Sequence, residues 1–277
     1  MILDVHTHAM RPDHWGCEWH TNWEPVYGHP ADDVTVARYD QAMAGVDLTF
    51  VFGIRATRAG INTPHEFIAD FVKESSTNCI GFMALDPSDP DAIEQLRHGV
   101  ELGLRGIKLY PVLAHFDPRD ERYDPFYRAA TDAGLIVLWH MGATPSPEGR
   151  LDYSQPLLVD EVARRHPGLT QIIAHLGHPW QRDTMVVLRK NRRVFSDVSA
   201  SWFRPVDGHR ALIRAQEWGV VDKLLFGSDF PLWTPAQAID GLIGLGELPS
   251  IPGAPSIAKG TIDWLLHGDP RPALGLV

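Results

Sequence analysis

Short apolar segments recur along this chain, and an amphipathic segment separates each one from the next. The apolar segments span residues 2–6, 48–54, 80–85, 106–110, 135–140, 171–175, 194–198 and 223–226. Most are continuous apolar runs rather than alternations of apolar and polar residues, which is typical of strands buried on both faces of a parallel sheet. The intervening segments have apolar residues every three or four positions, as amphipathic helices do. This alternation predicts a parallel α/β architecture.

The expected helices span residues 33–45, 63–76, 89–103, 125–134, 155–166, 180–191, 207–219 and 235–245, with an extra C-terminal helix at 256–267. Eight strand–helix units predict an α/β fold of the (β/α)8 TIM-barrel type. A doubly wound open sheet is the weaker alternative, because its first strand usually leads into a glycine-rich phosphate loop. No linker, repeat or low-complexity segment interrupts the pattern, so residues 1–277 are predicted to form a single domain.

One connection is much longer than the others. Residues 9 to about 32 follow the first strand and are rich in Trp, His, Pro and Gly. A loop of this length in a compact domain is usually functional or disordered. Its aromatic residues favour an ordered loop over the mouth of the barrel: Trp15, Trp19, Trp23 and Tyr27.

Composition restricts the possible partners. The net charge is −10 and no long basic run occurs, which argues against a nucleic-acid partner. No apolar run is long enough to cross a bilayer, so we expect no membrane partner. The first residues lack the basic and apolar regions of a signal peptide, and two cysteines, Cys17 and Cys79, do not make a disulfide framework. We therefore expect a cytoplasmic protein that acts on a small molecule.

Polar residues interrupt or follow several apolar runs at the same end of the predicted barrel, where TIM barrels have their active sites. These residues are His6, His8, Lys108, His140, His175 and Asp229. His6 and His8 are two positions apart, so both imidazoles can point into the barrel mouth from an extended strand. Alone, such a pair is as easily a chance feature of the surface. Together with a third imidazole and a carboxylate, it predicts a site for Zn²⁺ or a similar divalent ion.

Five motifs resemble the amidohydrolase superfamily. They are Asp-Val-His-Thr-His at 4–8, Gly-Ile-Lys-Leu-Tyr-Pro at 106–111, Trp-His-Met-Gly at 139–142, Ala-His-Leu-Gly at 174–177 and Gly-Ser-Asp-Phe-Pro at 227–231. Within that superfamily the chain is most similar to the amidohydrolase-related branch, which includes aminocarboxymuconate semialdehyde decarboxylase and pyrone dicarboxylate lactonase. The motifs cover nearly the whole chain in order, and they specify the superfamily much better than the substrate.

The resemblance implies that His6, His8, His140 and Asp229 bind one divalent metal ion, with Zn²⁺ preferred. It implies that His175 is the catalytic histidine of one-metal members, or a ligand of a second metal in two-metal members. In hydrolases of this kind the carboxylate of Asp229 also takes the proton of the attacking water. The chemistry is coherent, since a metal lowers the pKa of water, a carboxylate accepts the proton, and a histidine stabilises an oxyanion.

Lys108 allows three interpretations. Its surroundings resemble those of dihydroorotases, in which a carboxylated lysine bridges two metals. The same Gly-Ile-Lys pattern resembles one-metal members of the related branch. A lysine that only pairs with a carboxylate near the barrel mouth is the third possibility. We favour one metal, and a two-metal site with carboxylated Lys108 and bridging or ligating His175 is the alternative.

Several residues beyond the strand ends are candidates for substrate binding. Arg55, with Arg58 as second choice, follows the second strand and Arg204 follows the seventh, so either site could hold a carboxylate or simply be solvated. His178 replaces a glycine that is common in the branch. It either lines the pocket, caps the following helix or is a loop histidine without a catalytic duty, and the last of these is slightly favoured. Tryptophans after the last three strands are expected to form an apolar pocket wall: Trp180, Trp202 and Trp233.

Other polar residues lie close to the predicted metal ligands. Asp197, Ser199 and Ser201 close the seventh strand and are expected to orient the ligands. Asp4 is predicted by strand parity to share a face with His6, where it either holds an imidazole or is a buried structural acid.

The resulting hypothesis is a metal-dependent hydrolase that attacks a C–O or C–N bond of a small, carboxylate-bearing lactone or amide. The alternative is a metal-dependent, non-oxidative decarboxylase of a small unsaturated or aromatic acid. A barrel that only binds ligand is disfavoured, because nothing in a binding module requires this set of residues. Some aromatic acid decarboxylases of the branch replace the first His-x-His, and this chain keeps it, which favours hydrolysis. The resemblance also implies a homodimer.

Overall fold

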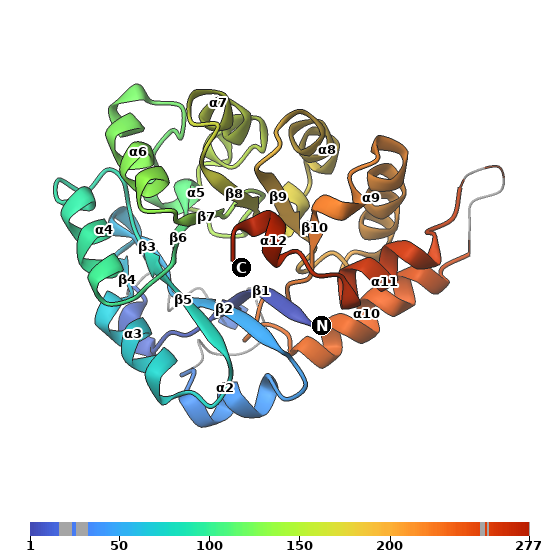
Figure 1. Ribbon diagram of the computed structural model, residues 1–277, viewed down its shortest axis with the longest axis horizontal. Helices are drawn as coiled ribbons and strands as arrows, with labels where there is room; N and C mark the ends of the chain where they lie inside the picture. Colours follow the sequence, from blue (N-terminus) through green and yellow to red (C-terminus); the bar gives the residue numbers. More distant parts are fainter. Residues whose placement is uncertain (17–23, 26–32, 250–252, 254, 277) are drawn as a thin grey trace.

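Eight parallel strands form one sheet in the computed structural model, which describes residues 1–16, 24–25, 33–249, 253 and 255–276. In spatial order they are β1 (Leu3–His8), β2 (Leu48–Phe52), β5 (Cys79–Ala84), β6 (Gly106–Leu109), β7 (Ile136–Trp139), β8 (Thr170–Ile173), β9 (Val194–Asp197) and β10 (Leu224–Leu225). The first and last strands meet, because the Val5 amide donates to the Phe226 carbonyl at 3.0 Å. The predicted TIM barrel is therefore confirmed (Figure 1).

Helices surround the barrel between successive strands (Figure 1). They are α2 (Val36–Ala42), α3 (His65–Glu74), α4 (Ala92–Glu101), α6 (Asp124–Asp132), α7 (Leu157–Arg165), α8 (Gln181–Lys190), α9 (Pro205–Trp218) and α10 (Pro235–Glu247), followed by α11 (Lys259–His267). Local sequence sets their ends. Thr234 accepts a hydrogen bond from the Gln237 amide in a capping box before α10, and Gly219 ends α9 with a φ of 62°.

Apolar side chains fill the inside of the barrel. Phe50 and Phe52 of β2, Phe82 of β5, Leu138 of β7 and Ile172 of β8 belong to one buried cluster. A second and larger cluster lies between the strands and the helices. Because the barrel interior is packed, a binding site must lie at one of its ends rather than in a channel.

Three small elements were not expected from the sequence. A hairpin of β3 (Arg55–Ala56) and β4 (Ile61–Asn62) follows β2, and α5 (Pro111–Ala114) follows β6. The helix α12 (Arg271–Leu274) contributes Leu274 to the apolar cluster inside the barrel, and Figure 1 places the C-terminus near the barrel centre. These elements are too short for a hydrophobic period to indicate them.

The long loop after β1 is described only in part. It begins with a 3-10 turn, η1 (Pro12–His14), and Trp15 packs against the large apolar cluster. The other aromatic residues predicted to order this loop lie outside the described residues: Trp19, Trp23 and Tyr27.

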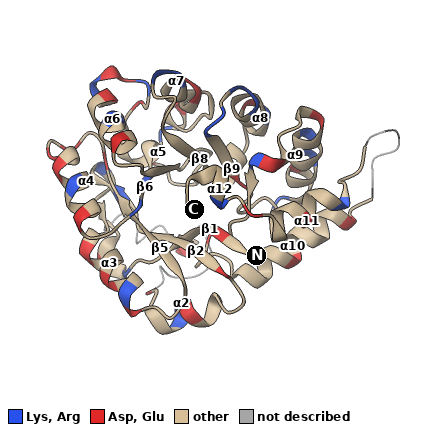
Figure 2. Ribbon diagram, in the orientation of Figure 1, with Lys and Arg blue, Asp and Glu red and all other residues tan. Residues whose placement is uncertain are grey.

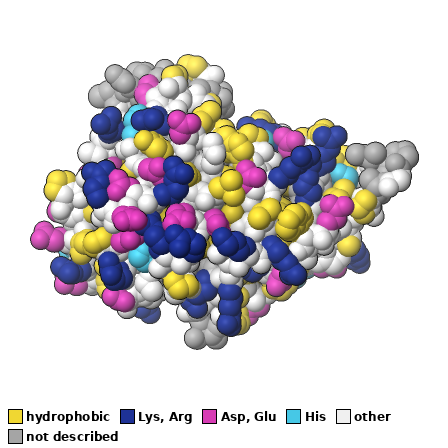
Figure 3. Space-filling model, turned by 90° about the horizontal axis from the view of Figure 1, so that it is seen from above, with side chains coloured by type: hydrophobic (Ala, Val, Ile, Leu, Met, Phe, Trp, Pro, Cys, Tyr) yellow, Lys and Arg dark blue, Asp and Glu magenta, His cyan; other side chains and the backbone are white. Residues whose placement is uncertain are grey.

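Charged residues lie mainly on the outer helices and loops (Figure 2). Acidic and basic side chains are interspersed with apolar ones on the face shown in Figure 3. In the part of the chain that the structure describes, no helix combines the length and the apolar character needed to cross a membrane.

Candidate metal centre and substrate cavity

A bulge in β1 determines which side chains reach the mouth of the barrel. Asp4 pairs with Thr49 of β2 and Thr7 pairs with Val51, so three steps along β1 match two along β2. Such a bulge interrupts the alternation of side chains between the two faces of a strand. The prediction that Asp4 shares a face with His6 by parity is therefore wrong.

Asp4 is instead a fully buried acid that binds backbone groups. Its Oδ1 accepts hydrogen bonds from the amides of His6 at 3.1 Å and Ser228 at 3.0 Å. Burial raises the pKa of Asp4 to about 7, although these hydrogen bonds oppose the rise. The side chain thus links β1 to the segment that leads into Asp229.

His6 is held by Asp197 at the end of β9. The imidazole Nδ1 lies 2.9 Å from Asp197 Oδ2, and both side chains are fully buried. An ionised carboxylate only accepts hydrogen bonds, so Nδ1 carries the proton and Nε2 is the unprotonated nitrogen, whose lone pair faces Lys108 Nζ at 3.2 Å. Burial lowers the pKa of His6, which keeps the ring neutral. This is the arrangement by which carboxylates orient metal-binding histidines.

A similar argument gives the protonation of His175. Ser199 donates its hydroxyl proton to Asp197 Oδ1, so its oxygen can only accept from His175 Nδ1, 2.7 Å away. The Nε2 of His175 is then the unprotonated nitrogen. Burial is the main cause that lowers the pKa of His175, to about 4. Asp197 therefore orients one imidazole directly and the other through a serine.

Asp229 brings a carboxylate to these rings. Its Oδ1 lies 3.4 Å from His6 Nε2 and 3.5 Å from His8 Nε2, and its amide donates to the His6 carbonyl at 2.8 Å. Burial favours the neutral acid, but the surrounding imidazoles of His6, His175 and His8 hold the pKa of Asp229 far below its ordinary value. Asp229 and His175 both have left-handed backbones, with φ of 63° and 54°. This conformation is uncommon outside glycine and is often found at functional sites.

His140 follows β7 and stacks on Tyr110, with the ring centroids 4.0 Å apart. Its Nε2 is buried and has no hydrogen-bond partner among the described residues. Burial, together with nearby His175 and Lys108, holds the pKa of His140 well below its ordinary value. A buried nitrogen without a partner costs free energy unless another group binds it.

The donor set fits a divalent cation. Atoms of His6, His175 and Asp229 that could bind a metal lie within 4.8 Å of one another. The unprotonated Nε2 of His6, the ionised Asp229 and the unpartnered nitrogen of His140 provide the nitrogen and oxygen ligands that zinc and similar ions take in proteins.

Lys108 lies beneath this centre. Its register with Leu138 points it into the barrel, where Nζ lies 3.2 Å from His6 Nε2 and 4.7 Å from the centroid of the Phe52 ring. Burial lowers the pKa of Lys108 to about 7, and the charges of Asp229 and Asp197 oppose this effect. No described carboxylate lies within the 4.0 Å of an ion pair, so the simple interpretation of a lysine paired with a carboxylate is wrong.

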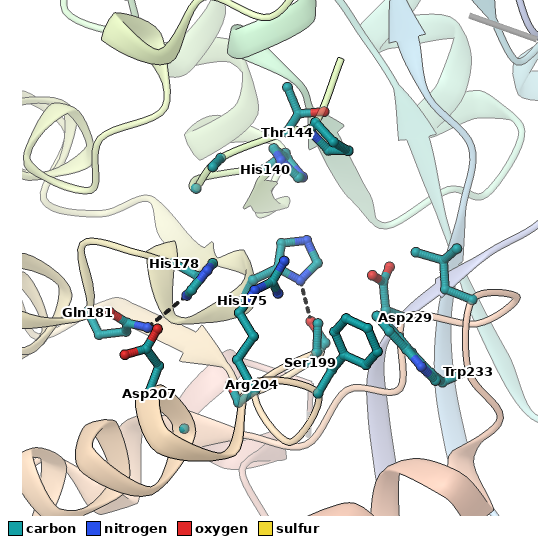
Figure 4. Close-up of a pocket in the computed structure, with 18 residues that line it drawn as sticks. His140, Thr144, His175, His178, Gln181, Ser199, Arg204, Asp207, Asp229 and Trp233 are labelled. Atoms are coloured by element: carbon teal, nitrogen blue, oxygen red, sulfur yellow. Dashed lines mark hydrogen bonds between the residues drawn. The ribbon is translucent and has the colours of Figure 1, made fainter. Parts of the chain in front are cut away.

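A cavity of about 490 Å³ opens beside these residues (Figure 4). His140, His175 and Asp229 form its inner end, and the predicted substrate-binding residues Arg204 and Trp233 lie along it. His178 also lines the cavity, the position that one of its interpretations expected. The lining further includes residues that were not predicted from the sequence: Thr144, Gln181 and Asp207.

Arg55 is not part of this cavity. Its Nε donates to Asp89 Oδ2 at 2.5 Å, and its Nη1 donates to Asn62 Oδ1 at 2.9 Å. The Arg55 guanidinium is thus bound by Asp89 and Asn62. The prediction that Arg55 binds the substrate carboxylate is wrong. The second choice, Arg58, is an exposed residue of the adjacent turn.

Two of the predicted tryptophans also lie outside the cavity lining. Trp202 packs edge-on behind Trp233, with ring centroids 5.9 Å apart, and a Cβ added to Gly241 of α10 would lie 2.4 Å from its ring. Trp180 precedes the first turn of α8, where its amide donates to the Gly177 carbonyl at 2.8 Å. Of the three, only Trp233 is in the described wall of the cavity.

The fold is that of a TIM barrel with polar residues gathered at the carboxyl ends of its strands, and a family comparison refines this class. The family model described as amidohydrolase matches residues 3–268. The chain therefore belongs to the amidohydrolase family, which is a family of enzymes. A search of curated proteins gives no match to this chain.

Several solved structures share this fold. An uncharacterized TIM-barrel protein from Bordetella bronchiseptica has a TM-score of 0.78 at 18% identity, covering 99% of both chains. A probable 2-pyrone-4,6-dicarboxylic acid hydrolase from Acinetobacter baumannii, with citric acid bound, has a TM-score of 0.69 at 15% identity, covering 99% of both chains. A dihydroxybenzoic acid decarboxylase from Polaromonas, with bound manganese and the inhibitor 2-nitroresorcinol, has a TM-score of 0.65 at 17% identity, covering 99% of this chain and 97% of the other.

Proposed function

We propose that this chain is a metal-dependent hydrolase that acts on a small carboxylate-bearing substrate, such as a lactone or a cyclic amide. The observation that carries the proposal is the position of Asp229. Its ionised carboxylate lies within 3.5 Å of the Nε2 atoms of His6 and His8, at the inner end of a cavity that can hold a small organic molecule.

His6, His8, His140 and Asp229 would hold the cation, which would supply Lewis-acid chemistry and make water a nucleophile near neutral pH. Zinc suits these ligands. Manganese in the related decarboxylase structure makes it the second metal to test.

The chain's own residues would move the protons. Asp229 is ionised and buried next to the rings, so it can accept a proton from the attacking nucleophile. His175 has an unprotonated Nε2 because its Nδ1 is bound to Ser199, so it begins the reaction as an acceptor and can later return the proton to a leaving group. Asp229 and His175 can act in this way only if both face the same reacting atom, and both line the cavity.

Arg204 would bind the substrate carboxylate. It lines the cavity, and no described acidic group forms an ion pair with it. A guanidinium offers two parallel donors that match a carboxylate. Phe203 and Trp233, whose ring centroids are 5.3 Å apart, provide apolar surface beside it for the body of a planar substrate.

Non-oxidative decarboxylation is the second candidate. The name of the Polaromonas structure and the aromatic wall of this cavity favour an aromatic acid as substrate for that reaction. The same set of imidazoles and the same carboxylate would serve either reaction.

One assay separates the two candidates. The purified protein, stripped of metal and reloaded with zinc or with manganese, would be tested on lactones, including 2-pyrone-4,6-dicarboxylate, on cyclic amides and on dihydroxybenzoates, while CO₂ release is monitored. Ring opening without CO₂ supports hydrolysis, and CO₂ release supports the second candidate. A metal-loaded protein that converts no lactone, cyclic amide or carboxylic acid in such a panel would overturn both.

A further inference from the structure

The backbone of His178 is fixed by hydrogen bonds to two different loops. Its amide donates to the His175 carbonyl at 3.0 Å, and its carbonyl accepts from the Ala143 amide at 2.7 Å. Gly142 approaches this peptide so closely that an added Cβ would lie 2.7 Å from the His178 carbonyl oxygen. Two loops from different strands therefore fix the backbone of a residue whose side chain lines the cavity.

The imidazole of His178 is fixed as well. The side-chain amide nitrogen of Gln181 lies 2.9 Å from His178 Nδ1, and Gln181 is only 7% exposed in the first turn of α8. An amide nitrogen can only donate, so Nδ1 is the acceptor and carries no proton. The neutral ring then has its proton on Nε2, and Gln181 determines which tautomer is present. Figure 4 shows this pair on the cavity wall together with Arg204 and Asp207.

A fixed N–H donor and a guanidinium on one wall form a recognition site for an anion. Asp207 lies on the same wall, and its charge opposes an anion that approaches Arg204 alone. A neutral donor adds binding without further charge and gives the bound carboxylate a defined direction.

We propose that His178 is a specificity-determining residue whose Nε2–H, held by Gln181, binds the substrate carboxylate together with Arg204. This inference rests on the proposed function only in taking the cavity as the substrate site. The substrate class is thereby narrowed to compounds whose carboxylate is separated from the reacting bond, because His178 and Asp229 lie on opposite sides of His175 in Figure 4.

The tautomer can be measured directly. In the full-length protein labelled with ¹⁵N, histidine ring spectra would show a protonated Nε2 and an unprotonated Nδ1 for His178, assigned by the loss of its signals in His178→Phe. Gln181→Met, which removes the partner of Nδ1 at similar volume, should give a mixture of tautomers. A protonated Nδ1 in the parent protein overturns the proposal.

Binding is tested with a probe that cannot react. Benzene-1,3-dicarboxylate is the probe, and the neutral benzene-1,3-dicarboxamide is its matched control. The parent should bind the dicarboxylate at least tenfold more tightly than the diamide. His178→Phe should weaken dicarboxylate binding about tenfold and diamide binding less, because a neutral carbonyl accepts a weaker hydrogen bond than a carboxylate. His178→Gln, which keeps an N–H donor, should restore most of the affinity.

Equal affinity of the parent and His178→Phe for the dicarboxylate would overturn the inference, and so would a parent that does not bind it. Thermal unfolding of each variant shows whether a loss of affinity reflects a loss of fold, and His178→Gln gives a second variant if His178→Phe does not fold. Because the probe is inert, its binding is independent of turnover. An inactive protein that passes these tests would contradict the proposed function and leave the carboxylate site standing.

Discussion

Ser199 lies 2.7 Å from His175 and passes the orienting effect of Asp197 on to that ring. Removing the hydroxyl in Ser199→Ala should therefore let the imidazole rotate and exchange tautomers. We expect kcat/KM to fall roughly tenfold with metal content unchanged, because one hydrogen bond is worth about 1 kcal/mol or somewhat more. Steady-state kinetics with metal analysis checks this. Ser88→Ala, a serine whose hydroxyl binds Asp86 away from the cavity, is the control and should keep full activity.

Metal content tests the predicted ligand set. We expect close to one divalent ion per chain, preferably zinc, and loss of both metal and activity when His6 and His8 are replaced together by alanine. The physical reason is that both Nε2 atoms lie beside Asp229, so no complete set of ligands remains. Elemental analysis after extensive dialysis gives the number. Full metal retention in the double variant would exclude this ligand assignment.

His175→Asn distinguishes a one-metal centre from a two-metal centre. If His175 acts on the substrate, turnover should fall by about two to four orders of magnitude while the metal stays bound, since a group that moves a proton contributes about that much. Rapid-quench or steady-state rates are compared with metal content in the same sample. Parallel loss of metal and activity would instead support a second metal and a carboxylated Lys108.

Arg204→Lys tests the carboxylate site by replacing a planar fork with a point charge. The expected loss is about 1.5–3 kcal/mol of transition-state binding, which corresponds to a drop of roughly ten- to a hundred-fold in kcat/KM. Arg55→Lys is the matched control, because Arg55 is bound to Asp89 and does not line the cavity. It should change stability slightly and leave kcat/KM unaltered. Full activity of Arg204→Lys on the identified substrate would mean that the pocket recognises its ligand by apolar shape.

Asp40 makes a testable contribution to stability at neutral pH. Although burial tends to raise its pKa, hydrogen bonds from Ser75, Ser76 and Thr77 hold the pKa of Asp40 well below its ordinary value. A depressed folded-state pKa stabilises the fold above the unfolded pKa, about 4, and this stability is lost as the pH falls through the folded pKa. Asp40→Asn should therefore lower Tm at pH 7, and the difference from the parent should shrink below about pH 4. A difference in Tm that is the same at pH 3 and pH 7 would contradict this account.

The sequence was sufficient to predict the barrel because its determinants are local. Buried parallel strands read as apolar runs, and the residues that end those runs meet at one end of the barrel. His6, His140, His175 and Asp229 could be placed near one another for this reason, since no knowledge of side-chain contacts was needed. The metal they are predicted to bind, and the homodimer, stay predictions.

Long-range contacts account for what sequence reasoning missed. Nothing near Arg55 indicates that its guanidinium is taken by Asp89, which is 34 positions away. Trp202 follows a strand end as Trp233 does, but it packs against Gly241, which has no side chain, and lies edge-on to the Trp233 ring. The bulge in β1 has no glycine to reveal it, so parity misplaced Asp4.

The contact between Gln181 and His178 was also missed, although it is local in the sequence. A glutamine three positions after the histidine, in the first turn of a predicted helix, was a local signal that could have been read.

The residues that gather around Asp229 come from both sides of the seam where the barrel closes. His6 and His8 lie on the first strand, Asp229 follows the last, and the amide of Asp229 already binds the carbonyl of His6 across that join. A cation bound by these groups would link the first and last strands of the barrel, so its binding free energy would add to the free energy of unfolding. When the metal is scarce, the amount of folded protein would then fall together with the catalytic activity.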